Sequence, residues 1–96
     1  MQSISFIHIT LTVGVKYVVL KENELCGKPN TIGSDNVCRE AAEFTGTGRI
    51  TTETEASYPR GCYENNGEVY FNSHSVGNRE TYSSPICLKG KFIIHK

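Results

Sequence analysis

The chain has 96 residues, of which ten are Lys or Arg, ten are Asp or Glu, and four are Cys. This length fits one domain and leaves no room for a separate catalytic domain. The net charge is zero and no basic run occurs, so nucleic acid and anionic membranes are not expected partners. No apolar stretch reaches the roughly 18 residues that a transmembrane helix requires.

The N-terminal segment, residues 1–14, allows two interpretations. Apolar and polar residues alternate from Ile7 to Val15, which is the period of a half-buried strand. The alternative is a short, poor signal peptide, because Thr12, Val13 and Gly14 offer small residues for cleavage, although no positive region precedes them. The mature chain would then start near Val15. Residues 15–96 form a single disulfide-stapled domain in both interpretations.

Two regular elements are predicted next along the chain. The apolar run KYVVLK, residues 16–21, suits a strand, and Gly and Pro residues after it indicate a loop. Ser34 or Asp35 can cap a helix, and Gly46 can end it in the left-handed conformation. The apolar residues of this helix fall on one broad stripe, which consists of Val37, Cys38, Ala41, Ala42, Phe44 and Thr45.

The stretch YPRGCYENNGEVYFN, residues 58–72, carries the clearest local signal. The polar segment before it is predicted as a loop with one short strand around residues 49–52. Asn66 and Gly67 stand between two runs of strand formers and tolerate the positive φ that a two-residue type I′ turn requires. This turn fixes the register of a hairpin. It pairs Asn65 with Glu68, Glu64 with Val69, Tyr63 with Tyr70, and Cys62 with Phe71.

The four cysteines predict two disulfides and an oxidising compartment, because an even count in a short chain rich in Gly, Ser, Thr and Asn is typical of secreted domains. No C-x-x-C pair occurs, which argues against a four-thiolate zinc site. Three pairings remain open. A helix cysteine packed on an inward hairpin cysteine favours Cys38 with Cys62, which leaves Cys26 with Cys87. The second bond would bring KYVVLK beside the end of the chain, where GKFIIHK could pair with it or with the N-terminal strand.

The predicted register also sorts the hairpin side chains between two faces. A cysteine that forms a disulfide points inward, so Tyr63 and Tyr70 lie outside or beneath a covering segment. Together with Asn72 and His74 they form the predicted binding group, because tyrosine rings beside amide donors suit sugar stacking or protein contact. The structural alternative is a cross-strand tyrosine pair that only stabilises the hairpin.

A resemblance accompanies these motifs. A Cys-x-x-Ala-Ala helix precedes Tyr-Pro-x-Gly-Cys-Tyr, Asn-Gly, Val-Tyr-Phe-Asn and a final Cys, over about residues 17–88. The residues that carry this order are Tyr17, Cys26, Cys38, Ala41, Ala42, Tyr58, Pro59, Gly61, Cys62, Tyr63, Val69, Tyr70, Phe71, Asn72 and Cys87. It resembles a small cysteine module that recurs in extracellular proteins of marine protists. That resemblance implies that the chain is secreted and that the module spans about residues 17–88. It implies no activity.

A second likeness concerns the expected bond between a helix cysteine and a sheet cysteine. This arrangement of a helix bonded to a sheet is similar to the PAN/apple architecture, which binds proteins and sugars, although the cysteine spacings differ from the PAN pattern.

No catalytic residue, metal site or cofactor is predicted. His8, His74 and His95 stand apart in the sequence without the spacing of metal ligands. Cys38 could be a reactive thiolate beside a histidine base, but the disulfide explains it without such a partner. Glutamates could pair for glycoside hydrolysis, but solvated surface charge explains them better in so small a chain. These are Glu40, Glu43, Glu53, Glu55, Glu64 and Glu68.

The sequence therefore predicts an α+β domain with one helix packed on an antiparallel sheet of about four strands and two disulfides. The expected function is that of a secreted, non-enzymatic binding module for a glycan or an extracellular protein. The alternatives are a secreted inhibitor or effector, with residues 45–57 as a protruding loop, and a small hydrolase. Nothing blunts the edge of IHITLTV, so a homodimer could form by strand pairing.

Overall fold

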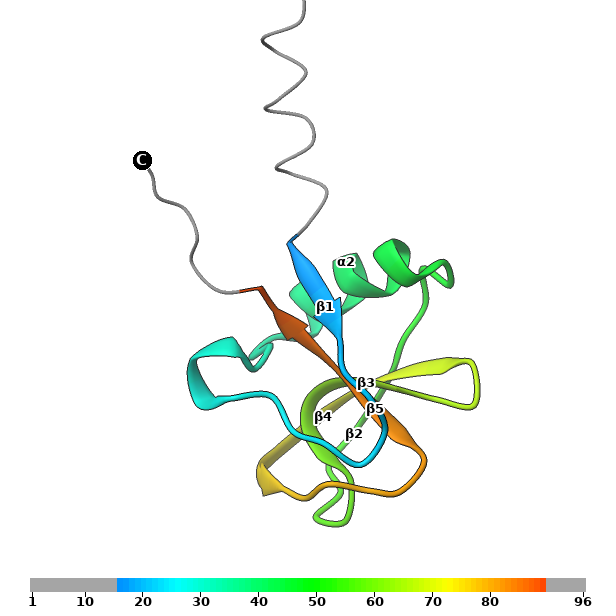
Figure 1. The fold of residues 1–96 in the computed structure, drawn as a ribbon. Helices are drawn as coiled ribbons and strands as arrows, with labels where there is room; N and C mark the ends of the chain where they lie inside the picture. The colour runs from blue at the N-terminus through cyan, green and yellow to red at the C-terminus, as the bar shows by residue number, and fades with distance from the viewer. Residues whose placement is uncertain (1–15, 90–96) are drawn as a thin grey trace, which may run out of the picture.

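The computed structural model describes residues 16–89. The strand or signal interpretation of residues 1–14, the dimer edge IHITLTV and the strand GKFIIHK lie outside the described residues. The described part contains one α-helix, one short 3-10 helix and five strands (Figure 1). In chain order they are β1 (Tyr17–Val19), η1 (Lys28–Asn30), α2 (Asp35–Thr45), β2 (Thr51–Glu53), β3 (Pro59–Asn65), β4 (Glu68–Gly77) and β5 (Ser83–Leu88).

The five strands form one mixed sheet in the order β1-β5-β3-β4-β2. Strand β5 pairs antiparallel with β1 and β3, β3 pairs antiparallel with β4, and β2 runs parallel to β4. The predicted α+β class is confirmed. The sheet has five strands where about four were expected, and it is mixed instead of antiparallel because β2 pairs parallel with β4. The short strand predicted around residues 49–52 overlaps β2. The three residues of β2, Thr-Thr-Glu, lack the apolar alternation that marks a strand in the sequence.

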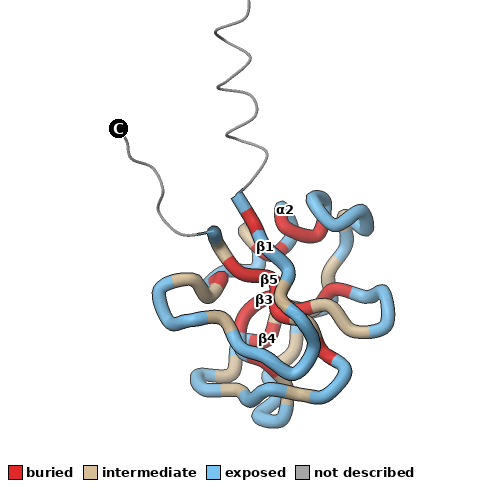
Figure 2. The backbone as a smooth tube through the Cα atoms, viewed as in Figure 1, coloured by how far each residue is buried: buried red, intermediate tan, exposed pale blue. Residues whose placement is uncertain are grey.

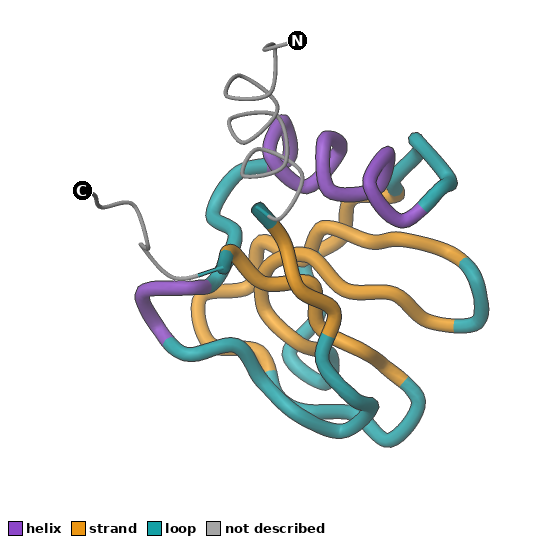
Figure 3. The backbone as a smooth tube through the Cα atoms, turned by 45° about the horizontal axis from the view of Figure 1, so that its top comes forward, coloured by secondary structure: helices purple, strands orange, loops and turns teal. Residues whose placement is uncertain are grey.

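Helix α2 lies on one side of the strands (Figure 3). The Ser34 hydroxyl accepts a hydrogen bond from the backbone N–H of Val37 at 3.2 Å, which caps the first turn. Gly46 ends the helix with a φ of 110°. Toward the sheet the helix buries Cys38, Ala41 and Ala42, whereas Phe44, which belongs to the predicted stripe, is half exposed. These small side chains let the helix approach the sheet closely.

The hairpin of β3 and β4 has the predicted register at all four residue pairs from Cys62 with Phe71 to Asn65 with Glu68. Asn66 and Gly67 occupy the turn with φ values of 58° and 85°. Both values lie in the left-handed region, as a type I′ turn requires. The turn residues were therefore sufficient to predict the register of this hairpin.

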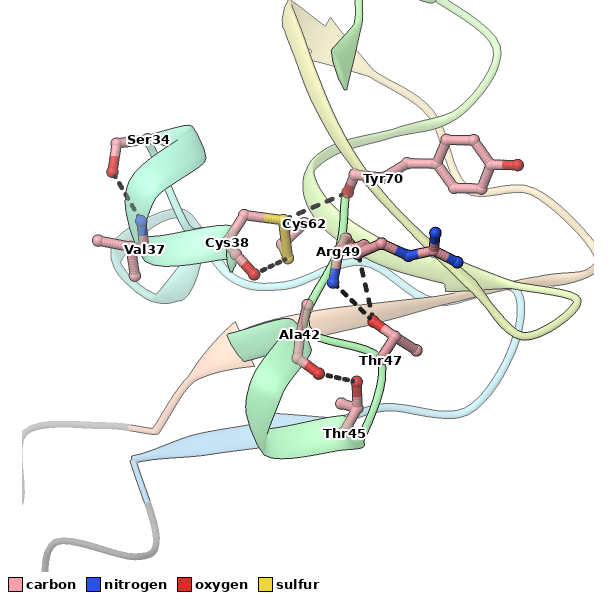
Figure 4. Close-up of a disulfide and its surroundings, with 9 residues drawn as sticks. All are labelled: Ser34, Val37, Cys38, Ala42, Thr45, Thr47, Arg49, Cys62 and Tyr70. Carbon is pink, nitrogen blue, oxygen red and sulfur yellow. Dashed lines mark hydrogen bonds between the residues drawn. A yellow bond between two sulfur atoms is a disulfide. The ribbon is translucent and has the colours of Figure 1, made fainter. Parts of the chain in front are cut away.

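Both predicted disulfides are confirmed. Cys38 on α2 bonds Cys62 on β3 with a Cα–Cα distance of 5.4 Å, which ties the helix to the centre of the sheet (Figure 4). Cys26 bonds Cys87 on β5 with a Cα–Cα distance of 5.6 Å. This bond holds the chain after β1 against β5, and β1 pairs antiparallel with β5. Strand β5 was not among the predicted strands, because the last strand was expected in GKFIIHK, outside the described residues.

The hydrophobic core lies between α2 and the sheet. Figure 2 shows buried segments along the central strands and on the helix, with exposed segments in the loops. Tyr17 on β1 belongs to this side, since its hydroxyl donates to Oε1 of Glu40 on α2 at 3.0 Å. The buried core residues are Tyr17, Ile32, Cys38, Ala41, Ala42, Cys62, Val69 and Ile86.

Candidate functional site

The sheet face opposite α2 gathers tyrosines and glutamates from three strands. Side chains alternate between faces along a strand, so Tyr63 points away from α2 because Cys62 points toward it. Tyr70 lies opposite Tyr63, and Thr51 on β2 lies opposite Tyr70. Glu53 on β2 therefore shares this face. Figure 4 shows the ring of Tyr70 directed away from the helix and its disulfide.

Three tyrosine rings pack together on this face. The rings of Tyr63 and Tyr70 stack with their centroids 5.2 Å apart and their planes at 15°. The ring of Tyr58 meets that of Tyr63 at 5.7 Å with a tilt of 50°. Both arrangements are favourable aromatic geometries that hold the rings rigidly. The predicted pairing of Tyr63 with Tyr70 is thus part of a larger aromatic cluster.

Residues 54–58, which we call the covering segment, run between β2 and β3 and are held to β4 by Asn72. The Asn72 amide nitrogen donates to the backbone carbonyls of Glu55 (2.8 Å), Tyr58 (3.0 Å) and Pro59 (3.0 Å). Its side-chain oxygen accepts from the backbone N–H groups of Glu55 (2.8 Å) and His74 (3.1 Å). Asn72 is fully buried. It satisfies backbone groups of the covering segment and offers no surface to a ligand.

Tyr63 is fully buried beneath this packing, so of the two expected positions, outside or beneath a covering segment, the second is correct. Its hydroxyl donates to Oε2 of Glu53. Burial, and to a lesser extent the hydrogen bond and charge of Glu53, raises the pKa of Tyr63 far above its ordinary value. Tyr63 therefore stays neutral, and it supports the neighbouring rings from below.

The other two rings line a cavity of about 380 Å³ that opens on this face. Tyr58 and Tyr70 are half-buried, so part of each ring remains accessible. We call this cavity the tyrosine cleft. Its lining residues are Glu53, Glu55, Tyr58, Tyr63, Asn65 and Tyr70. Its volume lies in the range of small-ligand sites, and it combines aromatic rings with carboxylates and an amide.

A neighbouring cavity of about 450 Å³ continues this surface, and we call it the glutamate cleft. It shares Tyr58 and Asn65 with the tyrosine cleft. The Asn65 side-chain nitrogen donates to the hydroxyl of Ser83 at 3.0 Å, which fixes the amide between the two cavities. The lining residues of the glutamate cleft are Glu22, Tyr58, Glu64, Asn65, Asn66, Glu80 and Tyr82.

His74, the fourth residue of the predicted binding group, does not line either cleft. Its Nδ1 accepts hydrogen bonds from the backbone N–H groups of Val76 (3.1 Å) and Gly77 (2.9 Å), which organises the end of β4. The structure thus brings Tyr63 and Tyr70 together at a cavity, where Tyr70 is accessible and Tyr63 is buried. It gives Asn72 and His74 hydrogen bonds to the backbone instead.

Sequence reasoning missed the role of Glu53, Glu55 and Tyr58 in this site. The glutamates alternate in the segment TTETEAS, which puts both on one side if the segment is extended. That alternation was the available signal. It was weak because polar alternation also describes a solvated loop.

No group of three or more His, Cys, Asp or Glu within residues 16–89 is placed to hold a metal ion. Among the same residues, no helix is long and apolar enough to span a membrane. The residues 45–57 do not protrude freely, since β2 pairs with β4 and Asn72 binds the backbone of Glu55.

Comparison with models of known protein families, with curated proteins and with solved structures found no match to this chain. The resemblances to the protist cysteine module and to PAN/apple domains therefore stay predictions.

Proposed function

We propose that this chain is a secreted, non-enzymatic recognition module that binds a glycan or an extracellular protein at the tyrosine cleft. One observation carries the proposal: the accessible rings of Tyr58 and Tyr70 share a cavity with the carboxylates of Glu53 and Glu55. Aromatic faces supply rigid contact area at low entropic cost, and carboxylates and an amide supply hydrogen bonds that select the ligand.

Secretion is proposed from the disulfides. All four cysteines are bonded in the structure, and disulfides persist in oxidising compartments such as the extracellular space. A module of this kind needs a rigid surface, and one disulfide joins the loop after β1 to β5 while the other joins α2 to β3. The rigid frame supports preorganised binding, which lowers the entropic cost of association.

The presence of Glu53 and Glu55 in the lining of one cavity favours a small glycoside hydrolase as the second candidate, because such enzymes use a pair of carboxylates. One carboxylate oxygen of Glu53 already accepts from the buried Tyr63 hydroxyl, which gives this glutamate a structural role. For the hydrolase, Glu53→Gln would abolish turnover of an oligosaccharide while binding persists. The recognition module shows no turnover in either form.

The test of recognition is an array of glycans and extracellular proteins probed with three forms of the protein. Tyr70→Ala removes a half-buried ring from the cleft, and Phe44→Ala removes a half-exposed ring from the helix side. We expect Tyr70→Ala to weaken binding about tenfold or more, as for a central aromatic contact, and Phe44→Ala to leave it unchanged. Equal binding by the wild type and Tyr70→Ala to every captured ligand would contradict the proposal.

A further inference from the structure

The two clefts form one surface whose charge has a single sign. Tyr58 and Asn65 line both cavities, so the cavities adjoin. We call the joint lining the tyrosine–glutamate surface. No Lys or Arg is among its lining residues. Its glutamates and tyrosines are Glu22, Glu53, Glu55, Glu64, Glu80, Tyr58, Tyr63, Tyr70 and Tyr82.

Uncharged donors bind the carboxylates of three of the five glutamates that line this surface, within residues 16–89. Glu53 accepts from the Tyr63 hydroxyl. Glu64 also lines the glutamate cleft, but alternation along β3 turns its side chain toward the α2 side, where it accepts from the backbone N–H of Gly67 at 3.0 Å. Glu80 accepts from the Ser83 hydroxyl at 2.7 Å and from the backbone N–H of Tyr82 at 3.0 Å. These bonds orient the carboxylates but leave their negative charges without compensation. Fixed charges of one sign in adjoining cavities focus the field on an incoming cation.

Basic side chains line a different cavity. Lys28 and Arg60, together with Leu25 and Val76, line a space of about 690 Å³ beside the Cys26 loop. The chain as a whole is neutral, but the linings of these cavities are not: Lys28 and Arg60 line one, and the adjoining clefts contain glutamates and no Lys or Arg. The tyrosine–glutamate surface therefore attracts a ligand of positive charge.

We propose that the tyrosine–glutamate surface binds an arginine-rich segment of an extracellular partner protein. This inference rests on the proposed recognition function and names its ligand. A guanidinium group stacks flat on a tyrosine ring and donates two parallel hydrogen bonds to a carboxylate, so it matches both kinds of group in the tyrosine cleft. A neutral glycan would use the rings but leave the negative charges uncompensated. Two adjoining cavities suit two side chains of one segment.

The probe is a peptide of about ten residues with three arginines separated by Gly and Ser. The control is the same peptide with citrulline in place of each arginine, because citrulline keeps the shape of the side chain and lacks its charge. Titration into the isotopically labelled full chain, followed by NMR, gives the affinity and the amides that shift. We expect the arginine peptide to shift Glu53, Asn65 and Tyr70, and to bind about tenfold more tightly than the citrulline peptide. Raising the salt from about 50 mM to about 500 mM should weaken the arginine peptide further.

The matched variants remove one charge each. Glu55→Gln removes a carboxylate from the tyrosine cleft, and Glu43→Gln removes an exposed one from α2. We expect weaker peptide binding, about three- to tenfold, for Glu55→Gln and unchanged binding for Glu43→Gln. Equal affinity for the arginine and citrulline peptides, or equal loss in both variants, would overturn the inference.

Failure of this inference and failure of the recognition function can be told apart. A neutral glycan that binds with a loss in Tyr70→Ala, while the arginine peptide does not bind, overturns the arginine ligand and leaves the recognition function standing. A matching peptide with lysine in place of arginine that binds as tightly as the arginine peptide also overturns the preference for a guanidinium. If Tyr70→Ala weakens the binding of no ligand of any class, both the arginine ligand and the recognition function are overturned.

Discussion

Tyr63 shows how one buried side chain supports the site without touching solvent. It has no exposed surface, stacks against Tyr70, and donates the hydrogen bond of its hydroxyl to Glu53. Tyr17 plays a similar part on the helix side, where burial and the hydrogen bond to Glu40 raise its pKa to about 12. Both hydroxyls are held in their neutral form by the folded state.

These raised pKa values predict a loss of stability at high pH. Unfolded tyrosine titrates near pH 10, so below that pH both states hold the proton and the stabilisation is complete. Above pH 10 the unfolded state ionises first, and the free energy of unfolding should fall by about 1.4 kcal/mol per pH unit for each such tyrosine. For Tyr17 the fall ends near its folded pKa of about 12, whereas for Tyr63 it continues to higher pH.

Urea denaturation at a series of pH values, with phenolate absorbance recorded alongside, measures this effect. Tyr63→Phe keeps the ring but removes the ionisable hydroxyl, so its stability should fall less steeply above pH 10 than that of the wild type. Identical slopes in the two proteins would contradict the account of Tyr63.

Among the elements, the covering segment depends most on a single side chain. Asn72 binds backbone groups of Glu55, Tyr58 and Pro59 through both ends of its amide. Without these bonds, the segment would leave Tyr63 open to water. The segment and β4 therefore act as one unit, although they are far apart in sequence.

Asn72→Asp tests this unit with almost no change in shape. The new carboxylate oxygen would face three carbonyl oxygens in a buried position, which leaves them unsatisfied and repelled. We expect the free energy of unfolding to drop by about 3 kcal/mol or more. The control is Asn78→Asp at an exposed position, where the side-chain oxygen keeps its acceptor role toward Arg79 N–H. A similar small loss in both variants would refute the anchoring role of Asn72.

The elements also show which structure could be predicted from sequence. The β3–β4 hairpin followed from the φ demands of Asn66 and Gly67, and its register then turned Cys62 toward a helix that carries Cys38. A short strand near β2 was predicted, but its parallel pairing with β4 was not, because its own residues are polar and carry no signal for a partner. The buried position of Tyr63 in the site could not be predicted from the sequence either, since it depends on tertiary hydrogen bonds made by Asn72.

At the scale of the whole molecule, two disulfides stabilise a sheet with a small core. They join residues 61 and 24 positions apart in the sequence. Loop-closure entropy predicts about 4 kcal/mol for the Cys26–Cys87 bond and about 3.5 kcal/mol for Cys38–Cys62. These values are comparable to the whole net stability of a small domain, which is on the order of 5–15 kcal/mol.

Replacing each pair of cysteines by alanine separates the contributions. The Cys38 and Cys62 pair is fully buried under α2, so its removal also leaves a cavity and should cost about 1–2 kcal/mol beyond its loop term. We therefore expect the larger loss of stability for that pair, although it closes the shorter loop. Urea denaturation measures both. A larger loss for the Cys26 and Cys87 pair would contradict the packing role of the Cys38–Cys62 bond.

The separation of acidic and basic side chains between different cavities is a property of the whole molecule. The sequence is neutral in total, but the described structure collects glutamates at the tyrosine and glutamate clefts and places Lys28 and Arg60 in another cavity. Such separation orients an approaching partner before contact. Composition alone hides it, because only the fold decides which charges meet.

The central claim is that the tyrosine cleft seats the ligand, and hydroxyl-radical footprinting of the free and bound protein tests it most directly. Radicals oxidise accessible aromatic rings, and mass spectrometry assigns the oxidation to each residue. With a saturating ligand from the array, Tyr58 and Tyr70 should become protected, while Phe44 on the helix side should be oxidised as in the free protein. Unchanged oxidation of Tyr58 and Tyr70 under saturating ligand would contradict the claim.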